Sequence, residues 1–162
     1  MSTLASPTTR RSVSGLLMFV AAAVATALIG VLAVTDTAEQ YKSLDQPSWA
    51  PPSWLFGPVW TVLYALIAIS GWLVWRRTGW SAELVPFAVQ LVLNAVWTPL
   101  FFGFGLRGLA LIDIALLWLA IAWTVVRFRG RSGVAVWLLV PYWLWTTFAA
   151  ALNAAVWSLN RG

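Results

Sequence analysis

Residues 132–160 read SGVAVWLLVPYWLWTTFAAALNAAVWSLN, and no side chain in this stretch carries a charge. About 20 apolar residues are enough to cross the hydrocarbon core of a bilayer as an α-helix. The stretch therefore predicts a transmembrane helix. Pro141 lies inside it, as Pro99 lies inside an earlier apolar stretch. A proline in a helix removes a backbone hydrogen bond and kinks the helix, which can open a cavity between helices.

Charged residues divide the rest of the chain into further apolar stretches. The predicted spans are residues 12–35, 58–75, 84–106, 108–126 and 132–158. The sequence thus predicts an all-α membrane protein, a five-transmembrane-helix bundle. We expect residues 12–162 to form this single domain after a disordered tail at 1–11. The long first loop, residues 36–57, is the only sizeable stretch expected outside the membrane.

The overall composition agrees with a membrane protein. Of the 162 residues, 61% are hydrophobic and 9% are charged, 13 are tryptophan, and the mean hydropathy is +0.83. Soluble domains carry about 25% charged residues, so most of this surface must face lipid. The net charge of +5 does not form one patch, which argues against nucleic-acid binding. Because Cys and His are both absent, disulfides, thiolate metal sites, Cys or His nucleophiles and a His-ligated haem are excluded.

The distribution of basic residues predicts the orientation. One side of the predicted bundle carries Arg10, Arg11, Arg76, Arg77, Arg127, Arg129 and Arg131. The other side carries only Lys42, Arg107 and Arg161. The positive-inside rule then places the N-terminus in the cytoplasm and the C-terminus outside. The first apolar stretch could instead be a cleaved signal peptide, but it is longer than a typical signal sequence.

The first loop combines prolines with tryptophans. Prolines 47, 51 and 52 fix the backbone, so we expect a stiff, non-helical segment. Trp49 and Trp54 lie between or beside them. These indoles have two interpretations: residues of an aromatic belt at the membrane surface, or part of a lid over a ligand cavity, since loops of this length are often functional.

Polar residues inside the predicted spans also have two interpretations. Gln90 and Asn94 are four residues apart and share a helix face, Asn153 lies deep in the last span, and Asp113 lies in the fourth. Amides in membrane helices commonly form hydrogen bonds between helices, and an intramembrane carboxylate usually faces a partner or a cavity. These side chains could therefore be structural, or could line one internal pocket.

Aromatic residues recur at helical spacing. Trp60 and Tyr64 share a face of the second span, and Tyr142 and Trp145 share a face of the fifth with Ala149. Flat aromatic walls beside a small residue suit a planar, apolar ligand, because offset stacking adds about 0.5–1.5 kcal/mol beyond burial. Ordinary packing between helices explains each of these residues taken singly.

Three motifs resemble a known family. They are YKSLDQPSWAPPSWLFGPVWTVLY at 41–64, NAVWTPLFF at 94–102 and PYWLWTTFAAALN at 141–153. They are similar to motifs of the TspO/MBR family, the tryptophan-rich sensory proteins, which include the mitochondrial translocator protein. The similarity covers nearly the whole chain after the N-terminal tail.

The resemblance implies a five-helix bundle, usually a homodimer, in a bacterial cell membrane, with a ligand pocket under the first loop. Members of the family bind porphyrins and haem, and some bacterial members degrade protoporphyrin in light with pocket tryptophans. By motif position, Trp60 and Trp145 match those tryptophans. The positions that match residues in or near the family's pocket are Asn94, Trp97, Asp113, Tyr142 and Ala149.

The chain departs from the family pattern at two places. The family often has Trp-Tyr where this chain has Gln40-Tyr41, so one aromatic residue of the first loop is missing and the pattern gives no support to a photochemical role for that loop. The sterol motif of the mitochondrial member needs a tyrosine and a basic residue where this chain has Ala154 and Ser158. That motif therefore gives no support to sterol recognition.

These observations lead to three hypotheses. The first is a tetrapyrrole-binding receptor or carrier for porphyrin handling and stress sensing, with protoporphyrin IX or haem as the ligand and no required cofactor or metal. The second is a light-dependent protoporphyrin-degrading enzyme in which Trp60 and Trp145 are catalytic. The third is a regulatory or structural membrane partner without a ligand. The expected ligand-binding residues are Trp49, Trp54, Trp60, Tyr64, Gln90, Asn94, Trp97, Asp113, Tyr142, Trp145, Ala149 and Asn153.

Overall fold

The computed structural model describes residues 7–32 and 37–161, and within these ranges the regular structure is entirely helical. The helices are α1 (Pro7–Leu32), α2 (Thr37–Ser43), α3 (Phe56–Thr78), α4 (Val85–Thr98), α5 (Arg107–Arg129) and α6 (Gly133–Leu159). Short 3-10 turns, η1 (Ser53–Leu55) and η2 (Ala82–Leu84), precede α3 and α4, and a π-helical turn, η3 (Pro99–Gly103), follows α4. In this part of the chain, five helical segments are long and apolar enough to cross a membrane. The predicted fold class is confirmed.

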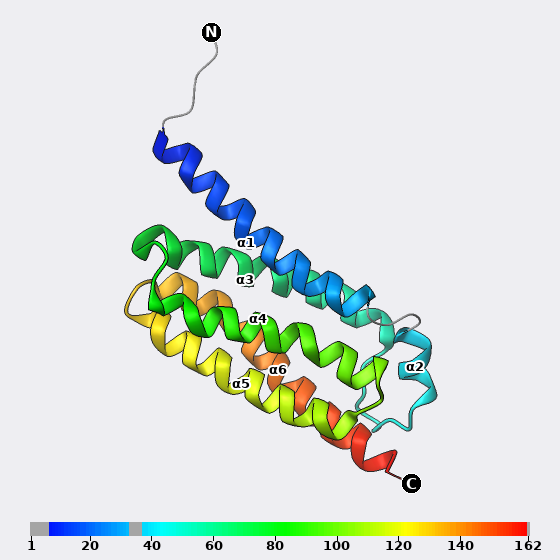
Figure 1. The fold of residues 1–162 in the computed structure, drawn as a ribbon. Coiled ribbons are helices and arrows are strands. Elements are labelled where there is room, and N and C mark those ends of the chain that lie inside the picture. Colours follow the sequence, from blue (N-terminus) through cyan, green and yellow to red (C-terminus); the bar gives the residue numbers. More distant parts are fainter. Residues whose placement is uncertain (1–6, 33–36, 162) are drawn as a thin grey trace.

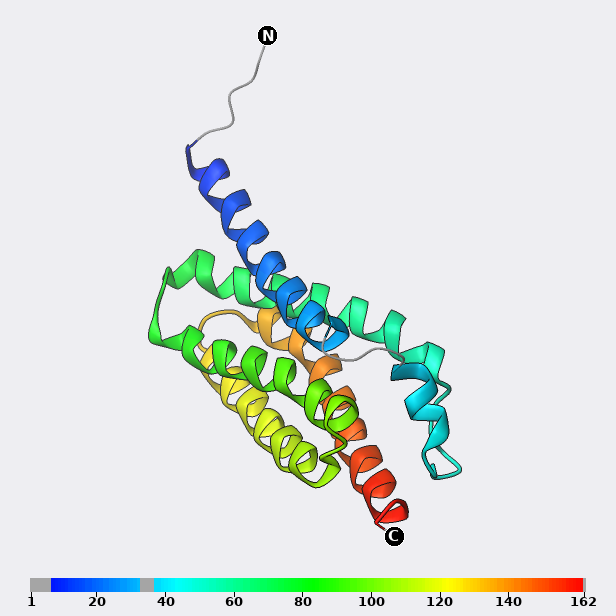
Figure 2. The same cartoon turned by 45° about the vertical axis from the view of Figure 1, so that its right-hand side comes forward.

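The five long helices form a closed ring (Figure 1). α1 packs against α3 and α4, α6 packs against α3 and α5, and α4 packs against α5. The short helix α2 lies at one end of the bundle, the end where α6 also ends, while α1 begins at the opposite end (Figures 1 and 2).

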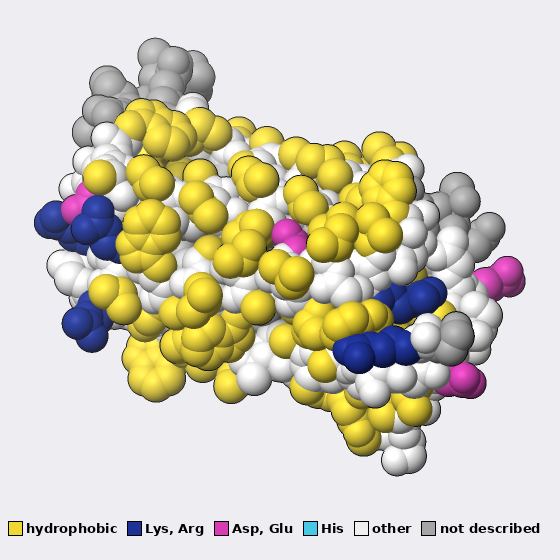
Figure 3. All heavy atoms as spheres, turned by 60° about the horizontal axis from the view of Figure 1, so that its bottom comes forward, with side chains coloured by type: hydrophobic (Ala, Val, Ile, Leu, Met, Phe, Trp, Pro, Cys, Tyr) yellow, Lys and Arg dark blue, Asp and Glu magenta, His cyan; other side chains and the backbone are white. Residues whose placement is uncertain are grey.

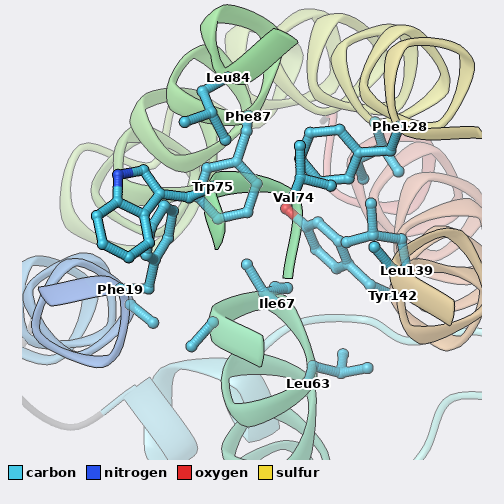
Figure 4. Close-up of a cluster of buried hydrophobic side chains, with 14 of the residues drawn as sticks. Phe19, Leu63, Ile67, Val74, Trp75, Leu84, Phe87, Phe128, Leu139 and Tyr142 are labelled. Carbon is cyan, nitrogen blue, oxygen red and sulfur yellow. The ribbon is translucent and has the colours of Figure 1, made fainter. Parts of the chain in front are cut away.

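A cluster of buried apolar side chains fills the bundle at the end away from α2 (Figure 4). Phe87 of α4 stacks on Phe128 of α5 with ring centroids 6.0 Å apart, and its ring also meets the edge of Phe19 of α1 at 5.6 Å. Gly71 of α3 lies beside the rings of Phe87 and Phe19. A Cβ atom there would lie 2.6 Å from Phe87 Cζ and 2.7 Å from Phe19 Cε1, so the packing requires glycine.

The outer surface of the bundle is apolar. Hydrophobic side chains cover the middle of the face in Figure 3, and Lys and Arg side chains gather toward its two ends. Large apolar residues on all five long helices point outward, among them Leu17, Val62, Val92, Leu116 and Leu144. An apolar surface of this extent is not tolerated in water. The chain is therefore a multi-pass membrane protein.

The structure corrects the predicted N-terminal tail. α1 begins at Pro7, so residues 7–11 belong to a helix although we predicted a disordered tail over 1–11. Proline is favoured at the start of a helix, because the backbone N–H that it lacks would have no hydrogen-bond partner within the helix at that position. Residues 1–6, and residues 33–36 at the end of the first predicted span, lie outside the described residues.

The predicted non-helical loop also needs correction, because α2 lies inside it at Thr37–Ser43. The prolines that stiffen this segment stand at 47, 51 and 52, after α2, so they do not interfere with its hydrogen bonds.

The two prolines within spans have different surroundings. At Pro99 the α-helix gives way to η3, where the N–H of Phe104 donates to the carbonyl of Pro99 at 2.9 Å. Proline lacks the N–H that would bond back to the preceding turn, and the chain responds with a wider turn that ends at Gly103, before the predicted boundary of 106. Pro141 lies inside α6, which continues to Leu159.

Candidate ligand-binding site

A cavity of about 420 Å³ lies inside the ring of helices at the end where α2 lies. All five long helices and α2 contribute to its wall. Cavities that bind small molecules in proteins measure about 300–1,000 Å³. The bundle thus has a cluster of buried apolar side chains toward one end and a cavity at the other.

Aromatic side chains form much of the cavity wall. On α3, Trp60 and Tyr64 are one helical turn apart, with ring centroids separated by 5.4 Å. Trp97 of α4 stacks on Phe101 of η3 at 5.0 Å and 24°. On α6, Trp145 stands one turn before Ala149, and both line the cavity. The small side chain leaves open space beside the indole.

Asn94 connects three helices at the cavity wall. Its Oδ1 accepts a hydrogen bond of 2.7 Å from the hydroxyl of Tyr64 on α3, and its Nδ2 donates to the hydroxyl of Tyr142 on α6 at 3.1 Å. Asn94 and Tyr142 are buried, and Tyr142 has no exposed surface. The network orients Tyr64. The side-chain amide of Asn94 therefore both forms hydrogen bonds between helices and lines the cavity.

Asn153 makes a second connection of this kind. Its Oδ1 accepts from the indole Nε1 of Trp97 at 3.1 Å, and its Nδ2 donates to the backbone carbonyl of Arg107 at 3.0 Å. The bonds join α6 to α4 and to the start of α5. They also fix the plane of the Trp97 indole against the cavity.

The segment from α2 to α3, which we call the cap, closes the outer end of the cavity. Tyr41 of α2 is buried, and its hydroxyl donates to the carbonyl of Pro51 at 3.2 Å. Burial raises the pKa of Tyr41 above its usual value, so the phenol stays neutral and keeps this bond. The side chain of Asn160 accepts from the backbone N–H of Asp45 at 3.1 Å and donates to its carbonyl at 2.9 Å. The two bonds attach the cap to the end of α6.

Seven of the predicted ligand-binding residues line the cavity. They are Trp60, Tyr64, Asn94, Trp97, Trp145, Ala149 and Asn153. They come from α3, α4 and α6, and the ring of helices brings them together around one space. The predicted catalytic pair, Trp60 and Trp145, is among them.

The other five predicted residues lie away from the cavity wall. Tyr142 lies behind Asn94, as the hydrogen bond above shows. Gln90 and Asp113 are buried, and within the described part of the chain the amide of Gln90 and one carboxylate oxygen of Asp113 have no hydrogen-bond partner. Trp49 meets the edge of Phe148 at 5.8 Å, and Trp54 is 70% exposed. Neither indole lines the cavity, although both residues belong to the cap, so the two interpretations of these residues stay predictions.

Several wall residues were not predicted from the sequence. Tyr41, Phe56, Phe101 and Phe102 could have been found from the quoted motifs, because all four lie within them. The contribution of α1 comes from small and aliphatic residues near its end, including Gly30. Such residues give no chemical signal in a sequence that is apolar throughout. Among the described residues, no three or more acidic side chains come together as a metal site needs.

Comparison with known proteins shows the family of the chain. The sequence pattern of the TspO/MBR family matches residues 17–158. The chain is 42% identical to the translocator protein of Homo sapiens over 127 residues, which cover 75% of each chain. It is 40% identical to protein CrtK of Rhodobacter capsulatus over 129 residues, covering 75% of this chain and 79% of that protein. It is 38% identical to the tryptophan-rich protein TspO of Archaeoglobus fulgidus over 151 residues, covering 90% and 98%. The chain therefore belongs to the TspO/MBR family.

Proposed function

We propose that the protein is an integral membrane receptor or carrier that binds a tetrapyrrole in the cavity and serves in porphyrin handling and stress sensing. The observation that carries this proposal is the cavity itself, about 420 Å³ in volume, with aromatic walls on three helices. Membership of the TspO/MBR family supports a receptor of this general kind. A partner protein without a ligand would need no such space, so the cavity argues against our third hypothesis.

The chemistry of the wall favours a flat ligand with one polar edge. Ile114 and Leu117 line the cavity, and at its outer end the hydroxyl residues Thr37, Ser53 and Thr61 line it. A porphyrin that enters with its ring between the indoles would direct its carboxylates to the hydroxyl end. Because the chain has no His or Cys to ligate iron, we place free-base protoporphyrin IX ahead of haem.

A titration tests the proposal. Protein in phospholipid nanodiscs is titrated with protoporphyrin IX, and the shift of the porphyrin absorption band is followed. Trp60→Ala and Trp145→Ala each remove a wall worth about 0.5–1.5 kcal/mol of stacking, so the double variant should bind about 5- to 150-fold more weakly. Trp137→Ala is the control, because that indole is 74% exposed on the outer surface. Absence of saturable binding by the unmodified protein would contradict the proposal.

Light-dependent oxidation of bound protoporphyrin is a second candidate function. It is favoured by the position of Trp60 and Trp145 on the wall of the same cavity, where they could relay an electron from the excited porphyrin to molecular oxygen, which is the oxidant. Illumination in the presence of oxygen should then consume porphyrin faster with the protein than without it. If Trp60→Phe and Trp145→Phe together leave that rate unchanged while the porphyrin stays bound, the tryptophans have no part in the reaction.

A further inference from the structure

A second hollow lies on the outside of the bundle, between α3 and α6. This outer groove is lined by Pro58, Val59, Val62, Leu63, Pro141, Leu144, Trp145 and Phe148. Trp145 is the residue that also lines the inner cavity. A single indole therefore forms a wall common to the cavity and to the groove.

The outer groove lies on α3 and α6, two of the helices that are long and apolar enough to cross a membrane, so we expect it to face hydrocarbon. Val62 on α3 is 59% exposed and Leu144 on α6 is 66% exposed, and both side chains are aliphatic. Every residue that lines the groove is apolar. The flat, apolar ring of a ligand dissolved in the bilayer can therefore lie in the groove without contact with water.

Hydrogen bonds attach the cap to α6, whereas the side chain of the common wall is held by ring contacts. Within the described residues, the indole Nε1 of Trp145 is buried and has no hydrogen-bond partner. Its ring is held by edge and tilted contacts to Phe56 at 5.9 Å and to Phe148 at 5.4 Å. Rotation of this side chain breaks no hydrogen bond. Displacement of the cap, in contrast, breaks both bonds between Asn160 and Asp45.

The cavity also reaches the surface between α1 and α3. Val31, Gly57 and Thr61 line the cavity and are themselves exposed. Hydroxyl-bearing residues of the cap lie at the same end. This opening suits the polar edge of a bound ligand, and it is the competing route for access.

We propose that Trp145 is a lateral gate through which a ligand passes from the bilayer, between α3 and α6, into the cavity. The inference rests on the proposed function, because it assigns a route to the ligand of that cavity. A ligand that partitions into the membrane is most concentrated where the groove lies. The indole then has two roles, as a wall when the ligand is bound and as a gate when the ligand passes.

Filling the groove from outside tests the gate. Val62→Trp and Leu144→Trp each place a large ring at the rim of the groove without changing the cavity wall. Val92→Trp is the matched control, since Val92 is 63% exposed on α4 and lines neither hollow. Association and dissociation of protoporphyrin IX are measured by stopped-flow absorbance with the protein in nanodiscs. We expect both rate constants to fall about tenfold in the two groove variants and not in the control.

The ratio of the two rate constants separates a gate from structural damage. An obstacle on the route slows binding and release equally, so the Kd should stay within about twofold of the original value. Unchanged rates in both groove variants, with saturable binding intact, would overturn the gate and leave the proposed function standing. Faster association in Asn160→Leu without any effect of the groove variants would likewise overturn it, in favour of access past the cap. No saturable binding by the unmodified protein would remove both proposals together.

Discussion

Replacement of Asn94 by leucine should show how strongly the polar network holds the cavity wall. The amide accepts from Tyr64 and donates to Tyr142, so the replacement removes two hydrogen bonds that connect α3, α4 and α6. Leucine has a similar volume, which limits the change to the loss of the polar group.

The expected loss of stability follows from these contacts. Hydrogen bonds between transmembrane helices contribute about 0.6 kcal/mol each on average, so two of them account for about 1 kcal/mol. Tyr142 has no exposed surface, and a buried hydroxyl left without its donor costs about 1–3 kcal/mol more. Tyr64 lines the cavity, where water can replace the lost partner. We therefore expect a loss of about 2–4 kcal/mol in the free energy of unfolding.

Unfolding in mixed micelles with increasing dodecyl sulfate, followed by circular dichroism, measures this loss. Three variants are compared with the original protein: Asn94→Leu, Tyr142→Phe and the two together. Because Tyr142→Phe removes the group that Asn94→Leu leaves unpartnered, the double variant should be more stable than the sum of the single losses predicts, by about 1 kcal/mol or more.

Two results would refute this reasoning. The first is strict additivity of the two single losses, which would mean that the amide and the hydroxyl do not interact. The second is a loss below about 0.5 kcal/mol for Asn94→Leu, less than the expected contribution of one such bond.

Three further predictions concern packing, topology and the cap. In the same micelle assay, Gly71→Ala should lower the free energy of unfolding by about 1–3 kcal/mol through overpacking, despite the better helix propensity of alanine. Gly57→Ala is the control and should not lower it, because no atom lies within 4 Å of the new methyl group. Because the chain has no cysteine, Asp45→Cys and Gly130→Cys each give a single reactive site. A membrane-impermeant maleimide added to intact bacterial cells should label position 45 at once and position 130 only after permeabilisation. The reverse order would contradict a cytoplasmic N-terminus. Asn160→Leu should speed hydrogen exchange at the amide of Asp45, its hydrogen-bond donor, and an unchanged rate would show that this bond does not hold the cap.

The spans could be predicted because each one ends at charged residues. Arg76 and Arg77 close α3, and Arg107 and Arg129 bound α5. A charge is costly inside hydrocarbon, so composition alone marks where a helix leaves the membrane. Composition does not mark where a helix begins outside the apolar stretches. The prediction missed both α2 and the first residues of α1 for that reason.

The candidate site could be predicted in part. Helical spacing grouped Trp60 with Tyr64 and Trp145 with Ala149, and these four residues do line one cavity. The same reasoning did not distinguish Asn94 from Gln90, which lies one turn earlier on α4. Asn94 lines the cavity, whereas Gln90 is buried but does not line it. Residues one turn apart share a face, but their distance from a cavity depends on where the neighbouring helices diverge.

One comparison tests most directly the claim that the hollow end of the bundle is the ligand site. Ala149 and Ala151 both lie on α6, but Ala149 lines the cavity and Ala151 is exposed on the outer surface. Ala149→Phe fills the cavity, and Ala151→Phe adds the same ring on the side that faces lipid. Equilibrium titration with protoporphyrin IX should show saturable binding that is lost in Ala149→Phe and kept in Ala151→Phe. Equal binding by both variants would contradict the claim.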